Sequence, residues 1–304
     1  MGNTVLLLYA VAVLCVLVPA VLTPVLAARP ARALARSAPV NRLRLGVAGL
    51  TRTVGRVPTA VMVVLAWSAA VVVVFWPLGE LLAALENPVD WPVQRYVSDR
   101  RDAGWEQLNM AYTYLGDRDP LKVVSVVGAA VFAVLWRRRW WIPVVAMVGQ
   151  FGLEQYVQEI LFLTVDRGHP PTGLGSYPSG GIARIVMTFG TLAVLAALTW
   201  RLSAGVRASL ATVVAVAAFL EAYTRIYTGK HWLTDVVGGL LFGPLLLVGV
   251  AAAVHILAGV PGGSQSRLPD SELPGSEQPG SELPGSGASS VEGRDGSVAI
   301  ASLR

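Results

Sequence analysis

The sequence is short of charged residues, of lysine and of cysteine. Only 14% of its 304 residues are charged, whereas 54% are hydrophobic. The only lysines are Lys122 and Lys230, so the formal net charge of +5 rests almost entirely on arginine. The single cysteine, Cys15, excludes a disulfide within the chain. A chain this apolar is typical of a membrane protein with several spans, and we expect its arginines to lie in loops rather than on a nucleic-acid-binding face.

Long apolar runs dominate what is present. Residues 5–26 carry no charge and exceed the roughly 20 residues that a helix needs to cross a bilayer. A cleaved signal peptide is the alternative, but the chain begins without a positive charge and the run is long for a signal core. We therefore expect a retained helix in 1–28. Further apolar segments predict an all-α, polytopic bundle with about seven transmembrane helices, the others lying at 58–77, 121–136, 141–164, 182–200, 209–227 and 235–257.

Arginine marks one side of this bundle. The segment 29–57 holds seven arginines and no acidic residue, and further arginines lie in 137–139 and 201–207. Because basic loops stay in the cytoplasm, these connections are predicted to be cytoplasmic. The connections 78–120, 165–181 and 228–234 then lie outside, and the long first one predicts an amphipathic helix over 90–114. We expect a multi-pass protein of the plasma membrane.

The end of the chain has a different composition. Residues 271–285 read SELPG, SEQPG and SELPG in tandem. Such a repeat buries too little apolar surface to fold, so 259–304 are predicted to form a disordered cytoplasmic tail. A docking segment for a basic partner is the alternative, and no particular partner is indicated. The folded part is thus predicted to be a membrane domain over 58–258.

The most informative stretch reads EAYTRIYTGKHWLTDVVGG at 221–239. His231 and Asp235 are four residues apart, so on a helix the carboxylate can orient the imidazole and raise its basicity. Arg225 supplies a planar donor fork that suits phosphate oxygens. A capped helix end with a solvated arginine explains the same residues equally well when they are taken alone.

Two other outer segments carry candidate groups. VDRGHPP at 165–171 contains Arg167 and His169, and SYPSGGIAR at 176–184 places Ser179, Gly180 and Gly181 just before an apolar helix. Glycines at a helix start allow backbone N–H groups to approach an anion at the positive end of the helix dipole.

Together the three segments resemble the type 2 phosphatidic acid phosphatase and vanadium haloperoxidase superfamily. Its motifs read Lys-x6-Arg-Pro, Pro-Ser-Gly-His and Ser-Arg-x5-His-x3-Asp, and the third is matched by Thr224, Arg225, His231 and Asp235. The resemblance covers roughly 90–245. It implies that His231 is a nucleophile that forms a phosphohistidine and that Asp235 orients it. It further implies phosphate binding by Arg225, Ser179, Gly180 and Gly181, with Arg167 and His169 as candidates, and chemistry without a metal or other cofactor.

The first two motifs depart from the pattern. Gly181 stands where the family has a histidine that protonates the leaving group, while Phe162 and His169 stand where it has a lysine and an arginine. A general acid contributes about 100- to 10,000-fold, so these losses bear directly on activity. A diphosphate is a better leaving group than an alkoxide and needs less help from an acid.

The resemblance favours an enzyme at the outer face that acts on a lipid phosphate or diphosphate, as a phosphatase or phosphotransferase. The alternative is an inactive relative that binds phospholipid head groups or acts as a membrane scaffold. A transporter would show pseudo-symmetric halves, and the sequence has no such repeat.

Overall fold

The computed structural model describes residues 37–175 and 177–259. The predicted first helix with Cys15, the predicted tail beyond Gly259, and Ser176 therefore lie outside the described residues. The segment 29–57, predicted as a loop, contains the helix α3 (Ala38–Val54) from residue 38 onward, and α3 packs beside α4 (Arg56–Ala83).

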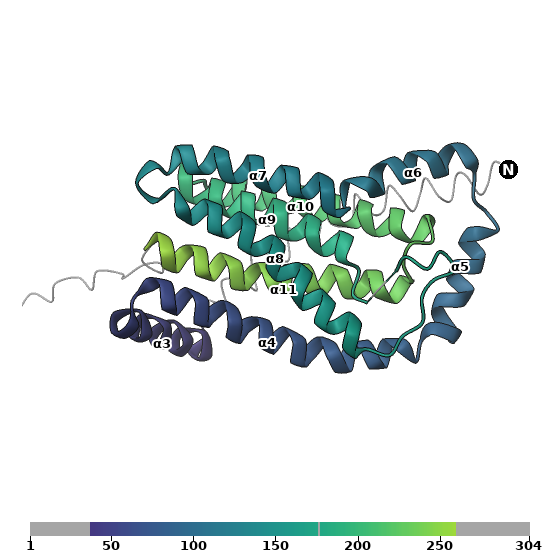
Figure 1. The fold of residues 1–304 in the computed structure, drawn as a ribbon, viewed down its shortest axis with the longest axis horizontal. Coiled ribbons are helices and arrows are strands. Elements are labelled where there is room, and N and C mark those ends of the chain that lie inside the picture. The colour runs from purple at the N-terminus through teal and green to yellow at the C-terminus, as the bar shows by residue number, and fades with distance from the viewer. Residues whose placement is uncertain (1–36, 176, 260–304) are drawn as a thin grey trace, which may run out of the picture. The chain divides into compact units, whose positions relative to one another are not determined.

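The six apolar segments predicted after residue 57 are confirmed as helices. They are α4, α7 (Arg118–Leu135), α8 (Trp141–Thr164), α9 (Gly180–Trp200), α10 (Ala204–Tyr227) and α11 (Leu233–Ala258). Figure 1 shows them running side by side, and α9 and α11 contact most of the others. The described part of the chain is thus an all-α bundle.

Four of these helices are long and apolar enough to cross a membrane, namely α4, α9, α10 and α11. The sequence predicted spans at α7 and α8 as well. However, α7 begins with Arg118, Asp119 and Lys122, and α8 carries Glu154 and Glu159 in its second half, which lowers the apolar character of both. The count of about seven spans stays a prediction.

The amphipathic helix predicted over 90–114 is instead two helices, α5 (Trp91–Ser98) and α6 (Ala103–Leu115). The break follows from Asp102, whose side chain accepts the Trp105 N–H at 3.0 Å and so starts a new helix. A short π-helical turn, η1 (Glu86–Asp90), joins α4 to α5, and a 3₁₀ turn, η2 (Arg137–Arg139), joins α7 to α8. Figure 1 shows α5 and α6 at the end of the bundle opposite α3.

Candidate active site

The three motif segments meet where α9 and α11 begin and α10 ends. The Ser179 N–H donates to the Asp235 carbonyl oxygen at 3.0 Å. A Cβ atom placed on Gly239 would lie 2.6 Å from the Ser179 carbonyl oxygen, so only glycine allows this approach of the two helices. Segments that are about 50 residues apart in sequence thus form one site.

His231 lies in the short connection between α10 and α11 and is 6% exposed. Its backbone N–H donates to the Arg225 carbonyl at 3.3 Å, and its Nδ1 lies 3.6 Å from the Asp235 Oδ2. Burial lowers the pKa of His231 from its usual 6.5, while the Asp235 carboxylate works in the opposite direction. The imidazole is therefore neutral at neutral pH, with Nδ1 toward the carboxylate and Nε2 available as a nucleophile.

Asp235 is held by the start of its own helix. Its Oδ2 accepts the Trp232 N–H at 3.2 Å, and its Oδ1 lies 3.3 Å from Nε of Arg167. Among the described residues, neither Asp235 Oδ1 nor His231 Nδ1 has a hydrogen-bond partner of good geometry. His231 Nδ1 and Asp235 Oδ2 are close enough to form a hydrogen bond once the imidazole ring gains positive charge.

Arg225 is buried between two carboxylates. Its Nε donates to Glu221 Oε1 at 2.5 Å and its Nη2 to Asp117 Oδ1 at 2.6 Å, with a further bond from Nη2 to the Thr113 carbonyl at 3.2 Å. The pairing of Glu221 with Arg225, expected from their spacing of four, is confirmed. Asp117 was not singled out as a site residue, because nothing local distinguishes it from other acids of the outer connection.

The absence of a side chain at Gly181 leaves room for the Arg225 guanidinium at the start of α9. A Cβ atom on Gly181 would overlap the Arg225 guanidinium, and a Cβ on Gly180 would overlap the Gln158 amide. The space that a histidine side chain would need at position 181 is thus occupied by a cation. Ser179, at the N-cap of α9, is fully buried, and its Oγ has no partner among the described residues.

Two further cations lie near this group. Lys230 Nζ is 3.6 Å from Asp117 Oδ2, so Asp117 bridges Lys230 and Arg225. Arg184, one turn into α9, places Nη1 3.5 Å from Glu154 Oε1 and donates from Nε to the Gly116 carbonyl at 3.2 Å. Each cation around the start of α9 therefore has a carboxylate beside it.

Arg167 lies on the other side of Asp235 from His231. Its Nη2 is 2.5 Å from Asp90 Oδ2 and also donates to the Thr234 hydroxyl. Asp90 accepts the Thr234 N–H at 3.0 Å and its hydroxyl at 2.7 Å, which caps α11. Burial raises the pKa of Asp90, and the Thr234 donors and the Arg167 guanidinium partly offset this. In this position Arg167 supports the Asp235 carboxylate.

His169 is solvent-exposed, and its Nδ1 lies 2.5 Å from the Gly175 carbonyl oxygen. Its ring centroid is 5.9 Å from that of Phe162. Among the contacts of the described residues, none joins His169 to His231, Arg225 or Ser179. The described residues also contain no group of three or more His, Cys, Asp and Glu side chains that could hold a metal ion.

The sequence and the fold were compared with those of known proteins. The model of the PAP2 superfamily matches residues 154–257, which include Ser179, Arg225, His231 and Asp235. A search of curated proteins gave no match. The fold is similar to the crystal structure of a transmembrane PAP2-type phosphatidylglycerolphosphate phosphatase from Bacillus subtilis, with a TM-score of 0.53 and 20% identity over 61% of this chain and 94% of that one. Residues 154–257, about a third of the chain, are thus similar to the PAP2 superfamily, and the fold is similar to that of a PAP2-type phosphatase.

Proposed function

We propose that this protein hydrolyses the phosphate of a membrane lipid through a phosphohistidine on His231. The observation that carries the proposal is the His231 ring, which lies 3.6 Å from the Asp235 carboxylate and near the start of α9, where Arg225 and the Ser179 hydroxyl also lie. The free N–H groups of the first turn of α9 and its positive dipole end suit a phosphoryl group there. The phosphatase from Bacillus subtilis, which shares the fold, acts on phosphatidylglycerolphosphate.

In the first step, His231 Nε2 bonds to phosphorus while the bond from phosphorus to the leaving oxygen breaks. Water then attacks the phosphohistidine, which frees inorganic phosphate and restores the imidazole. Arg225 and Lys230 stabilise the charge on the phosphoryl oxygens, a contribution that positioned donors make most effectively in a buried site.

A diphosphate-bearing lipid fits this site best. Position 181 has no side chain to protonate a leaving oxygen, and Arg225 fills the adjoining space. An alkoxide needs that proton, whereas a phosphate leaves as a stable anion. We therefore expect faster turnover of a lipid diphosphate than of a lipid monophosphate.

The test measures phosphate release by purified protein from a lipid monophosphate and a lipid diphosphate in mixed micelles. His231→Ala should reduce release by at least about 1,000-fold, as removal of a nucleophile does in other hydrolases. Glu159→Gln, an exposed change on α8, serves as the matched control and should leave the rate unchanged. A wild-type rate no higher than that of His231→Ala on both lipids would overturn the proposal.

A second candidate is an inactive relative that binds phospholipid head groups. It is favoured by the carboxylates that already pair with Arg225, Lys230 and Arg184. This candidate predicts saturable binding of the lipid phosphate without release of phosphate, and equal binding by wild type and His231→Ala.

A further inference from the structure

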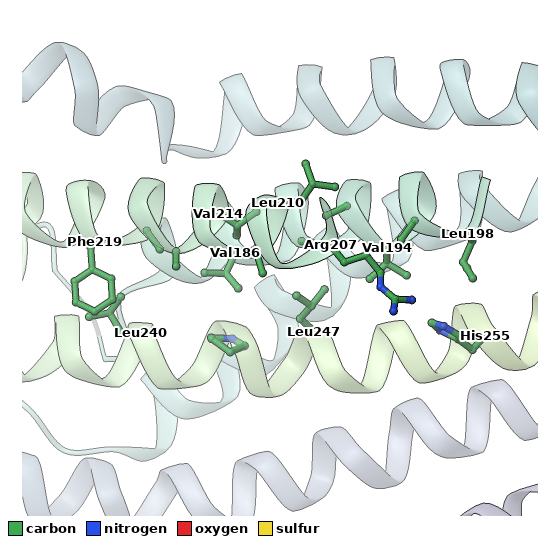
Figure 2. A pocket seen from close by; sticks show the side chains of 17 residues that line it. Val186, Val194, Leu198, Arg207, Leu210, Val214, Phe219, Leu240, Leu247 and His255 are labelled. Carbon is green, nitrogen blue, oxygen red and sulfur yellow. The ribbon is translucent and has the colours of Figure 1, made fainter. Parts of the chain in front are cut away.

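An apolar groove lies between α9, α10 and α11 and extends from near the candidate active site toward the arginine-rich end of the bundle. It has a volume of about 470 Å³ and is lined by residues between 186 and 198, 207 and 219, and 240 and 255. Figure 2 shows Phe219 and Leu240 at one end and Arg207 and His255 toward the other. Positions 240 and 255 of α11 are about 22 Å apart at 1.5 Å per residue, so the groove extends along the axis of α11.

The walls and one end of this groove differ in chemistry. Val194, Leu210 and Leu247 are among the apolar lining residues, and Arg207 and His255 are the polar ones. The His255 Nδ1–H donates to the Ala251 carbonyl oxygen at 2.8 Å, so Nε2 of the neutral ring is an acceptor, and Arg207 is the donor at this end of the groove. Both side chains are exposed, and no ion pair to Arg207 occurs among the described residues. An apolar groove with an arginine, Arg207, at one end suits an amphiphile with an anionic head group.

The surroundings of that end are uniformly basic. Arg139 donates to the Ala258 carbonyl at 2.5 Å, and the Arg56 guanidinium lies against Gly259, so these arginines gather where α11 ends. The described segments that meet there contain no aspartate or glutamate; they are 37–57, 136–141, 200–207 and 255–259. Basic pockets between membrane helices attract anionic lipid head groups.

We propose that this groove binds one acyl chain of an anionic phospholipid, whose phosphate contacts Arg207 at the end of the groove where His255 also lies. The lipid belongs to the leaflet on the arginine side of the membrane. The site is separate from the one at His231, because 24 residues of chain, or about 36 Å of helix, separate His231 from His255. The apolar segment 5–26 is a poorer occupant, because it has no acidic group to pair with Arg207 and is followed by arginines.

The test is native mass spectrometry of the purified full chain with phosphatidylglycerol or phosphatidylcholine of identical acyl chains. We expect one phosphatidylglycerol to be retained with about fivefold or greater preference over phosphatidylcholine, since one charge near a basic residue contributes that much. Arg207→Gln should weaken phosphatidylglycerol roughly fivefold and leave phosphatidylcholine unchanged. Ala211→Phe, which fills the groove, should weaken both lipids, and Ala215→Leu provides a second filling variant.

Arg138→Gln is the matched control, because Arg138 is an exposed arginine of the same end that does not line the groove. It should leave both affinities unchanged. Equal affinity for the two lipids, or lipid retention insensitive to both filling variants, would overturn the proposal.

A change of oligomeric mass in Ala211→Phe would instead identify a second copy as the occupant. A lower Tm without a change in lipid retention would point to the segment 5–26. None of these readouts depends on turnover at His231.

Discussion

Asp235 connects all three motif segments through different atoms. Its Oδ2 faces the His231 ring, its Oδ1 faces Arg167, and its carbonyl accepts the Ser179 N–H. A carboxylate held in this way fixes the tautomer and the direction of the imidazole. The alignment of His231 with the start of α9 therefore depends on one residue, through its carboxylate and its backbone carbonyl.

Replacing Asp235 with Asn keeps its shape but removes its charge. We expect kcat to fall by roughly 1,000- to 10,000-fold, as loss of the orienting carboxylate does in a catalytic triad. Because burial places the pKa of His231 below 6.5, the acid limb of the wild-type kcat/KM profile should lie below pH 6.5. The Asp235 carboxylate raises that pKa, so the limb should move to still lower pH in Asp235→Asn.

The measurement is kcat/KM against pH, supported by NMR titration of the His231 ring, which does not require turnover. Glu159→Gln should reproduce the wild-type profile. An unchanged His231 titration in Asp235→Asn would show that the carboxylate does not act on the ring.

At the scale of the helices, small residues bring α9 and α11 together. A Cβ on Gly243 would lie 3.0 Å from both Ala183 Cα and Val186 Cβ. Because one of these atoms belongs to the backbone, the helices cannot accept a larger residue without moving apart. Such close approach is how helices pack when lipid supplies no hydrophobic drive.

Gly243→Ala should therefore destabilise the bundle. Overpacking of this kind costs about 1–3 kcal/mol, which corresponds to a fall in Tm of roughly 2–10 °C. Thermal unfolding of the detergent-purified variant measures it.

Gly152→Ala is the control, since a Cβ there meets nothing within 4 Å. The Gly152→Ala variant should have an unchanged or slightly higher Tm, because alanine has a higher helix propensity than glycine. A Gly243→Ala protein as stable as this control would show that α9 and α11 tolerate separation.

The helices could be predicted from the apolar runs, because that signal is local. His231, Asp235 and the pairing of Glu221 with Arg225 could also be proposed, since they lie four residues apart on one helix face or beside it. The contacts of Arg225 with Asp117 and of Arg167 with Asp90 join residues 108 and 77 positions apart. No pattern in one sequence specifies such partners, because they depend on how the outer connection folds over the bundle.

At the scale of the whole chain, charge is divided between the ends of the described bundle. Asp90, Asp117 and Glu221 lie around the candidate active site, whereas the described segments at the end with Arg139 and Arg207 contain no acidic residue. The rule that basic loops stay in the cytoplasm predicts which way this bundle is oriented.

This orientation can be measured by cysteine labelling in a Cys15→Ala background. Leu174→Cys, at an exposed position near the candidate site, should react with an impermeant maleimide in intact cells. Ala204→Cys, exposed at the start of α10, should react only after lysis. The reverse pattern would place the candidate site on the cytoplasmic side.

Asp117 has a consequence for the choice of substrate. Its side chain is 34% exposed, whereas that of Glu221, the other carboxylate on Arg225, is fully buried. In the proposed reaction, a phosphate that reaches Arg225 and Lys230 therefore exchanges with Asp117, which already pairs with both. A phosphodiester brings one negative charge and only matches the carboxylate, whereas a terminal phosphate brings about two. Under the proposed function, competition with this internal anion would disfavour phosphodiester lipids and favour lipids that end in a free phosphate.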